Sequence, residues 1–541
     1  MHKIPVKHLI FLAALVLLNW GAGLKTGFLN DDFQIIGRSI PESIGEIFSP
    51  LVTGHVWGVY WRPLIRILYN IVLFFFGHNP FAFHAAGLVL FLGVLLVVYL
   101  TAFRLSKSPA AALITSSLFA VLPSRELPAL WIADQVELLV FFFTGLVYLT
   151  SDSYAKTGNR KYLILSSLMM TGALLSKELA FSVLLLPALM WLGSGAEKSS
   201  VSRYLALTGV FAVLTGALLS YRAFVIGSNL FAAEHLSNTG VLHLLRNFIL
   251  YIPTVFAGPD QFSFIMEWGY AGYVPAVLMM MFLAGIMYYG IRKTGSDQRA
   301  RLIYLTGAGW FILFLIPVLP VYMRWYVFTA SFGVILILSW ILTRIYEGLK
   351  QPGKVLPPAV IILLVLASHN IFISHKWNEA AELMEQIGVN ISANSRFVKE
   401  KPLVLWGVPD KLNRIPVMKL GQKEVFEYYS GAGSAEIYSP LRAELTGSSP
   451  EIQLLSADSS GFSLILYGGR FLQEGAGSKL LPGNEDFIFN YNGYSVKVET
   501  KITNAYPVSI AYISGDISQS EKLHLWFNGK EFNKLRMINE E

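Results

Sequence analysis

The chain contains no cysteine, which excludes disulfide bonds and thiol chemistry. It is also poor in charge: only 14% of its 541 residues are charged, whereas soluble globular proteins carry about 25%. Hydrophobic residues make up 54% of the chain. This composition excludes an ordinary soluble protein and favours one that crosses a membrane several times.

The net charge of +7 does not indicate a nucleic-acid partner. Residues 1–374 hold more than half of the Lys and Arg residues but fewer than half of the Asp and Glu residues. The excess of base therefore lies in the apolar part of the chain, where basic loops orient membrane helices.

Long apolar runs predict about eleven transmembrane helices. The first run is not followed by a small-residue cleavage motif, so we expect an uncleaved anchor. The runs cover residues 9–23, 84–103, 109–123, 130–150, 162–176, 178–193, 203–222, 272–291, 302–320, 326–346 and 357–374.

Basic connectors predict the orientation of these helices. The connectors 104–108, 154–161, 197–203, 292–301 and 344–354 all fall on one side if the helix count holds. The positive-inside rule makes that side cytoplasmic, together with the N-terminus. We expect a multi-pass protein of the bacterial inner (plasma) membrane, with residues 24–83 as the first extracytoplasmic loop.

Two amphipathic segments, and a change from apolar runs to strand-like patterns after residue 374, complete the domain prediction. Residues 62–77, in the loop 24–83, and residues 243–257 are predicted to form interfacial helices. After residue 374 a connecting helix is expected over 375–400. Residues 401–541 then predict a β-rich extracytoplasmic domain, with strands near 402–408, 461–469, 486–502, 508–514 and 522–532.

The stretch GFLNDDFQII puts two adjacent carboxylates, Asp31 and Asp32, just after the first apolar run. In a partly dry site one of two adjacent acids can have a raised pKa, and such a carboxylate can act as a general base. A solvated loop start or a cap on an interfacial helix explains the same residues equally well.

Further charges lie on the side opposite the basic connectors and are costly near a bilayer. Asp134 and Glu137 share a helix face at i, i+3, where they can line a cavity or pair with Lys177 or Arg125. The bases can bind phosphate, or they can pair with nearby acids or snorkel to headgroups. They are Arg62, Arg66, Arg125, Lys177, Arg222, Arg246 and Arg324.

No motif predicts a resident cofactor. His55, His78 and His84 lie in or near the outer loop, but no HxxxH or HxH spacing supports a metal site. We therefore assign no metal ligand and leave open whether a divalent cation binds. The P-loop, the G-x-G-x-x-G turn after a strand and the G-x-S-x-G elbow do not occur in the sequence.

Five segments in this order resemble the membrane glycosyltransferases of the GT-C fold, and among them the protein O-mannosyltransferases, including those with TPR repeats. They are the Asp31–Asp32 pair, YWRPLIRILYN…FFFGHNPFAFH at 60–84, LPSRELPALWIADQVELL at 122–139, LLSKELAF at 174–181 and PVYMRWYVFTASFG at 320–333. The resemblance covers residues 1–374. It implies a GT-C helical domain there. No TPR array follows this membrane part in the sequence.

The resemblance implies transfer of a sugar from a polyprenyl-phosphate donor to a hydroxyl of a protein, lipid or glycan acceptor, with inversion. Asp31 is then the expected base, with Asp32 as its neighbour or alternative. Cations stabilise the leaving phosphate, and acids orient sugar hydroxyls. The implied substrate-binding residues are Arg62, His84, Arg125, Glu126, Glu137, Lys177, Glu178 and Arg324.

Three other functions compete with this prediction. A flippase of lipid-linked sugars would more often show inverted repeats and broken helices in paired positions. An O-antigen polymerase or ligase would use diphosphate-linked donors. In a structural membrane protein the β-rich domain would be the working part, and both aspartates would be dispensable.

Overall fold

The computed structural model describes residues 4–53, 61–194, 198–226, 240–256, 273–294, 297–348, 356–393, 402–431, 436–447, 450–458, 460–473, 486–491, 493–502, 507–515 and 522–535. The chain divides into two compact units. The first holds the described residues of Met1–Leu24, Ile40–Met266 and Tyr270–Ser374. The second holds those of Lys25–Ser39 and His375–Glu541.

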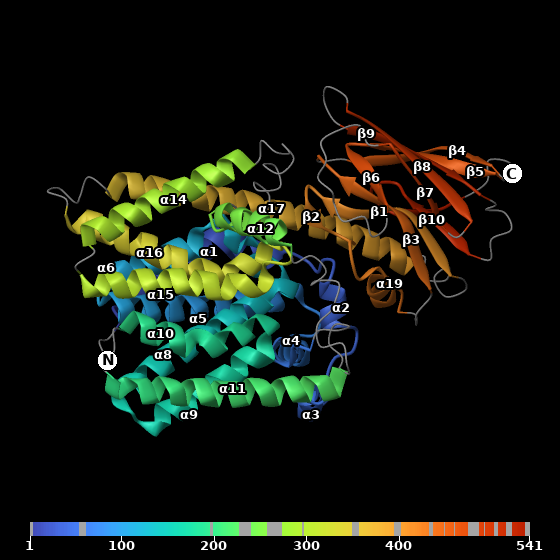
Figure 1. The fold of residues 1–541 in the computed structure, drawn as a ribbon. Coiled ribbons are helices and arrows are strands. Elements are labelled where there is room, and N and C mark those ends of the chain that lie inside the picture. The colour runs from blue at the N-terminus through green and yellow to red at the C-terminus, as the bar shows by residue number, and fades with distance from the viewer. Residues whose placement is uncertain are drawn as a thin grey trace. The chain divides into compact units, whose positions relative to one another are not determined.

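The first unit is helical, and its long helices lie side by side in roughly parallel or antiparallel directions (Figure 1). Each apolar run predicted from the sequence forms a helix. The helices are α1 Val6–Trp20, α3 Ile44–Phe48, α4 Pro63–Phe76, α5 Pro80–Ser106, α6 Pro109–Val121, α7 Glu126–Leu130, α8 Val136–Thr157, α9 Arg160–Ser176, α10 Leu186–Ser194, α11 Lys198–Ile226, α12 Val241–Thr254, α14 Tyr273–Thr294, α15 Gln298–Leu315 and α16 Val327–Glu347. Helix α17, Leu356–Ala393, continues into the second unit.

Among the described residues, seven helices are long and apolar enough to cross a membrane. Four shorter apolar helices accompany them, at Pro63–Phe76, Pro109–Val121, Glu178–Gly193 and Val277–Gly290. Helix α9 falls in neither set. The predicted class, a multi-pass helical membrane protein followed by a β-rich domain, is confirmed.

The basic connectors also fix where helices begin. Ser108 caps α6 by accepting a hydrogen bond from the Ala111 amide (3.2 Å), and Asn159 caps α9 through the Lys161 amide (2.9 Å). Asp297 caps α15 through the Arg299 amide (2.9 Å). Each cap satisfies an amide that the first helical turn leaves without a partner.

Helices α15 and α16 approach closely at a pair of glycines. A Cβ on Gly333 would lie 2.0 Å from the Gly307 carbonyl oxygen and 2.9 Å from the Phe311 amide nitrogen. Both are backbone atoms, so they cannot move aside as a side chain can. Small residues that let backbones approach in this way are typical of membrane helix interfaces.

We expect Gly333→Ala to lower the free energy of unfolding by about 1–3 kcal/mol, because α15 and α16 must separate to admit the methyl group. The control is Gly209→Ala in α11, where a Cβ would meet no atom within 4 Å. That change should be neutral or stabilising by up to about 1 kcal/mol, since alanine favours the helix. Thermal unfolding in detergent compares the two, and equal stability would contradict the close crossing.

The second unit contains two β-sheets (Figure 1). One sheet has the order β11-β10-β1-β3-β6. Its central strand β1 (Leu403–Leu412) is parallel to β10 (Leu523–Phe527) and to β3 (Ile437–Leu445). The edge strands β6 (Gly469–Gln473) and β11 (Phe532–Lys534) are antiparallel to their neighbours. The short β2 (Ile415–Pro416) pairs with β1. The other sheet is antiparallel, in the order β4 (Glu451–Asp458), β5 (Gly461–Tyr467), β9 (Pro507–Ser514), β8 (Tyr494–Ile502) and β7 (Phe487–Tyr491).

Trp406 of β1 joins the two sheets. Its ring centroid lies 5.3 Å from that of Phe462 in β5 and 5.7 Å from that of Tyr494 in β8. The strands predicted near 402–408, 461–469, 486–502, 508–514 and 522–532 are confirmed. Strands β2, β3, β4 and β6 and helix α19 (Gln422–Ser430) were not predicted.

The segment 25–39, which carries the two aspartates, belongs to the second unit. Thr26 donates a hydrogen bond to the Asn378 side chain of α17 (2.7 Å). Phe33, in the short helix α2 (Asp32–Ile36), packs against Tyr428 and Tyr429 of α19, with ring centroids 5.3 and 5.8 Å apart. The acid-bearing loop is therefore built into the unit that also holds the β-sheets.

Candidate functional site

The two adjacent aspartates have different surroundings. Asp32 is 1% exposed, and its Oδ2 accepts a hydrogen bond from the Leu29 amide (2.9 Å), so its carboxylate closes the turn that begins α2. Asp31 is half-buried, and its Oδ1 accepts a hydrogen bond from Asn30 Nδ2 (2.7 Å). The two members therefore differ: Asp32 holds the turn before α2, whereas Asp31, the N-cap residue of α2, makes no capping hydrogen bond with its side chain and keeps a partly accessible carboxylate.

Burial raises the pKa of Asp31 to about 6, while Lys419 opposes the increase and Glu424 adds to it. A carboxylate with this pKa is largely ionised at neutral pH and can still accept a proton. It therefore meets the requirement for a general base near neutral pH.

In the first unit, Glu178 pairs with two arginines that come from different segments of the chain. Its Oε2 accepts hydrogen bonds from Arg62 Nε (3.0 Å) and Nη2 (2.8 Å), and its Oε1 forms an ion pair with Arg222 Nη1 at 2.9 Å. Arg62 directly precedes α4, Glu178 opens the 3-10 helix η5 (Glu178–Leu185), and Arg222 lies near the end of α11. Three segments far apart in the sequence therefore meet at one carboxylate.

A second buried ion pair lies beside the first. Lys177 donates a hydrogen bond to Glu137 of α8, and its Nζ lies 4.6 Å from the ring centroid of Tyr326. Asp134, in the 3-10 helix η4 (Ile132–Gln135), interacts electrostatically with Glu137, Lys177 and Arg62. These six charged residues form what we call the buried charge cluster: Arg62, Asp134, Glu137, Lys177, Glu178 and Arg222.

Two acids of this cluster, Asp134 and Glu137, each have one carboxylate oxygen that can accept a further hydrogen bond. Among the described residues, no hydrogen-bond partner is found for Asp134 Oδ2 or Glu137 Oε2, although both atoms are buried. A buried carboxylate oxygen without a donor is costly in free energy, so each of these atoms can accept a further hydrogen bond, for example from a ligand hydroxyl or from water.

The aromatic segment at 324–326 borders the same cluster. Trp325 and Tyr326 lie in the 3-10 helix η9 (Arg324–Tyr326); the Trp325 ring centroid is 6.1 Å from that of Trp131, just before η4. The half-buried Arg324 opens η9. The structure therefore brings together residues from four segments singled out in the sequence: 60–84, 122–139, 174–181 and 320–333.

Three further expected site residues, His84, Arg125 and Glu126, are also buried. His84 and Glu126 are buried in α5 and at the start of α7, respectively. Arg125 is fully buried and donates to Ser124 Oγ (3.1 Å), Ser331 Oγ (2.6 Å) and the Phe328 carbonyl (3.2 Å). Its guanidinium also lies over the rings of Phe119 and Phe328, 4.3 and 4.8 Å from their centroids. This guanidinium ties the 3-10 helix η3 (Pro123–Arg125) to α16.

No group of three or more His, Asp or Glu side chains in the described part of the chain is arranged to hold a metal ion. His55, one of the histidines considered for such a site, lies outside the described residues.

Asp134 and Arg222 were among the charges noted in the sequence, but neither was among the expected substrate-binding residues, and Tyr326 was not noted at all. For Arg222 the available signal is a single arginine near the end of a long apolar helix, which needs a partner in the membrane. For Asp134 it is the i, i+3 spacing to Glu137. Tyr326 gives no such signal, because an aromatic residue at a helix start is common near membrane surfaces.

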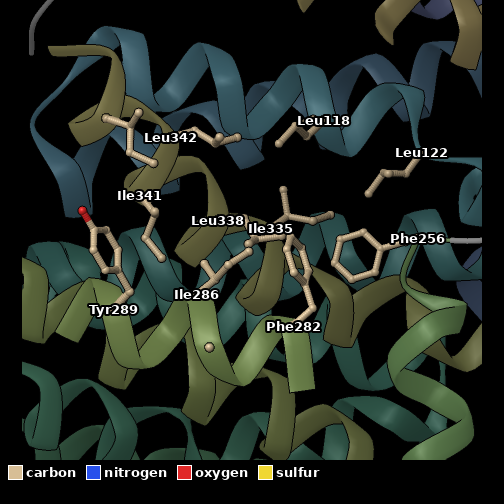
Figure 2. Close-up of a pocket in the computed structure, with 12 residues that line it drawn as sticks. Leu118, Leu122, Phe256, Phe282, Ile286, Tyr289, Ile335, Leu338, Ile341 and Leu342 are labelled. Atoms are coloured by element: carbon tan, nitrogen blue, oxygen red, sulfur yellow. The ribbon is translucent and has the colours of Figure 1, made fainter. Parts of the chain in front are cut away.

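An apolar pocket of about 580 Å³ lies between α6, α14 and α16 (Figure 2). Its lining is aliphatic and aromatic, including Leu118 of α6, Phe282 and Ile286 of α14, and Ile335 and Leu338 of α16. Figure 2 shows Leu122 and Phe256 together at one end and Tyr289 at the other.

The Leu122 end of the pocket adjoins η3. Leu122 directly precedes η3, and Ser124 donates a hydrogen bond to the Val255 carbonyl (2.7 Å), next to Phe256. The pocket thus runs between three apolar helices and ends near a polar turn, an arrangement suited to a hydrocarbon chain.

No family model matches the chain. It is similar to protein O-mannosyl-transferase TMTC1 of Homo sapiens, with 29% identity over 220 residues, covering 36% of this chain and 25% of that protein. The Mus musculus counterpart is 27% identical over 201 residues, covering 33% of this chain and 21% of the other. The match thus spans about a quarter of the length of these relatives. The resemblance to protein O-mannosyltransferases expected from the motifs is confirmed by these relatives.

Two solved proteins are similar in structure at low sequence identity. ArnT from Cupriavidus metallidurans in the apo state has a TM-score of 0.48 and 13% identity, covering 93% of this chain and 97% of that one. ArnT bound to undecaprenyl phosphate gives a TM-score of 0.47 and 12% identity, covering 83% and 96%. The oligosaccharyltransferase AglB from Archaeoglobus fulgidus, in complex with an inhibitory peptide and a dolichol-phosphate, gives 0.45 and 11%, covering 80% and 64%.

Proposed function

We propose that the protein is a membrane glycosyltransferase that moves a sugar from a polyprenyl-phosphate donor to a hydroxyl acceptor. The observation that carries this proposal is the buried charge cluster, with its two carboxylate oxygens that lack donors in the described structure. A purely structural set of ion pairs has no need of spare buried acceptors, whereas a sugar supplies hydroxyl donors. The similarity to proteins named O-mannosyl-transferases supports the same reaction class.

The donor requires a place for a hydrocarbon chain and cations for a phosphate. The apolar pocket between α6, α14 and α16 suits the polyprenyl chain. Arg62, Lys177 and Arg324 carry the positive charge that stabilises the leaving phosphate. Arg125, held by two serines and two phenyl rings, is assigned to keeping η3 against α16.

The acids of the cluster take two roles. Asp134 and Glu137 accept hydrogen bonds from sugar hydroxyls through their spare oxygens. Glu178 fixes Arg62 and Arg222, so that the guanidinium groups are oriented before the donor binds. Glu126 and His84 stay candidates for substrate contact on the strength of the sequence resemblance.

Asp31 is the proposed base. An acceptor hydroxyl attacks the anomeric carbon from the face opposite the phosphate, the C–O bond to the phosphate breaks, and Asp31 receives the hydroxyl proton. The phosphate leaves with the bonding electron pair, and the configuration inverts. Asp32 acts indirectly, by closing the turn that presents Asp31.

The donor sugar, the acceptor and the orientation in the membrane are proposed from the sequence. The donor sugar is a hexose such as mannose, and the acceptor is a protein or glycolipid. The protein lies in the inner membrane of a bacterium, with its N-terminus in the cytoplasm. The acid-bearing loop and the β-rich unit lie on the opposite side, where basic connectors are few.

The proposal is tested with membranes from cells that make the protein, supplied with radiolabelled sugars on polyprenyl monophosphate or on polyprenyl diphosphate. We expect label to pass from the monophosphate donors to protein or glycolipid, and sugar-free polyprenyl phosphate to compete. Transfer from diphosphate donors alone would indicate a polymerase or ligase. Movement of the donor across the membrane without transfer would indicate a flippase.

The pKa of Asp31 predicts how transfer depends on pH. Only the ionised carboxylate accepts a proton, so the rate should rise with pH through about 6 and level off above it. Stability has the opposite dependence on pH. The folded state holds the proton of the Asp31 carboxyl more tightly than the unfolded chain does, because the pKa of Asp31 is raised on folding. The contribution of Asp31 to stability therefore falls as pH rises between about 4 and 6. Initial rates between pH 5 and 8 check the first point, and a rate that falls across this range would contradict it.

A further inference from the structure

Asn30 occupies an unusual backbone conformation next to Asp31. Its φ is 50°, in the left-handed region that residues other than glycine rarely adopt. Its amide nitrogen donates a hydrogen bond to the Val417 carbonyl (3.0 Å), and the residue is 2% exposed. A conformation of this kind persists only where the surrounding contacts hold it.

The side-chain amide of Asn30 makes one hydrogen bond at each end. Its Oδ1 accepts from the Leu420 backbone amide (2.6 Å), and its Nδ2 donates to Asp31 Oδ1 (2.7 Å). Because a backbone amide can only donate, it fixes which end of the Asn30 side chain faces Leu420. The amino group must then point toward the Asp31 carboxylate.

The turn 417–421, which follows β2, is shaped for this contact. Gly421 has a φ of 69°, and a Cβ there would lie 2.9 Å from the Asn30 carbonyl oxygen. Glycine therefore permits the close approach of the two backbones. Lys419 in this turn and Glu424 in α19 are the charged groups that act on Asp31 from the packed elements, and Asp32 adjoins it in the chain.

We propose that Asn30 is a positioning residue, through which the turn 417–421 of the β-rich unit holds the Asp31 carboxylate in its working orientation and ionised form. This inference rests on the proposed function, in which Asp31 is the base. It gives the β-rich unit a part in the reaction, because Val417 and Leu420 fix the residue that contacts the base.

The test compares Asn30→Gly with Asn413→Gly. Asn413 is a matched control in the same unit: its φ is 48°, and its side chain also bonds to backbone, accepting from the Gly447 amide (2.9 Å) and donating to the Gly447 carbonyl (3.2 Å). Glycine tolerates both conformations, so neither change should disturb the fold through backbone strain. Asn30→Asp is the second variant, because it keeps the acceptor for Leu420 but loses the donor to Asp31.

Two measurements are made on the full-length protein in membranes. The first is the pH profile of sugar transfer, with kcat and KM for the donor. The second is the pH dependence of Asp31 labelling by dicyclohexylcarbodiimide, which reacts with the protonated carboxyl and is read by mass spectrometry without any turnover.

Loss of the amide donor should make the Asp31 carboxylate harder to ionise. In Asn30→Gly we expect the labelling midpoint and the acid limb of the rate profile to move up by about one pH unit. The kcat should fall about tenfold, with KM within about twofold. Asn30→Asp should shift the midpoint further in the same direction, since it adds a negative charge, and Asn413→Gly should match the unaltered protein.

A labelling midpoint that is unchanged in both Asn30 variants would overturn the inference, whatever transfer shows. An equal shift in Asn413→Gly would also overturn it, because the effect would then not be specific to Asn30. Lack of transfer by the unaltered protein with every donor would overturn the proposed function instead. The labelling midpoints would still decide whether Asn30 controls the Asp31 carboxylate.

Discussion

Asp31→Asn is expected to lower the rate of sugar transfer by about 10²–10⁴-fold, the range typical of a lost general base. Asparagine has the shape of aspartate, and its carbonyl oxygen can still accept the hydrogen bond from Asn30. The fold should therefore survive, and the loss should appear in kcat more than in the KM for the donor.

Asp32→Asn is the matched control for this experiment. Its side-chain oxygen can replace Oδ2 as acceptor for the Leu29 amide, so the turn is kept and the rate should fall by less than about tenfold. Initial rates in membranes with equal amounts of each variant separate the two residues. A larger loss in Asp32→Asn than in Asp31→Asn would exchange their roles.

Glu178→Gln should cause the largest loss of stability. The change removes the countercharge of two buried arginines, Arg62 and Arg222, and breaking a buried ion pair in this way costs roughly 3–5 kcal/mol. The Glu178 side chain is 23% exposed, which favours the lower end of this range. Thermal unfolding of the purified protein in detergent measures the effect.

The control for Glu178→Gln is Glu347→Gln. Glu347 pairs with Arg344 at 3.1 Å, but both side chains are 47% exposed, so the change should cost less than about 1 kcal/mol. If the two variants unfold at the same temperature, the buried charge cluster does not contribute to stability as described.

The helices could be predicted from the sequence because membrane helices need long apolar runs, and local composition records these directly. Part of the buried charge cluster could also be foreseen. Charges near a bilayer are costly without partners, so pairing of Glu137 with Lys177 was one of the alternatives left open, and it is the one that the structure shows. The identity of each partner was less accessible, since Glu178 pairs with Arg222 of α11, a helix that carries no other charge between Arg203 and Arg222.

Other features have no local signal. Strand β3 contains Pro440, and β4 alternates polar and apolar residues only in part, so their pairing depends on neighbouring strands. The sequence places a cation at Arg125 but does not tell that Phe119 and Phe328 enclose it. The packing of segment 25–39 on α19 joins residues some four hundred positions apart, which no pattern in either segment records.

The hydrogen bond between Asn30 and Leu420 joins residues 390 positions apart, and this separation sets an order of events during biosynthesis. The ribosome adds about 5–20 residues per second, so Asn30 is made roughly 20–80 s before its partner. Throughout that interval the first helices can enter the membrane, but Asp31 lacks the turn that orients it. With Asp31 as the base, as proposed above, a nascent chain would gain transfer activity only after the turn 417–421 has folded against Asn30.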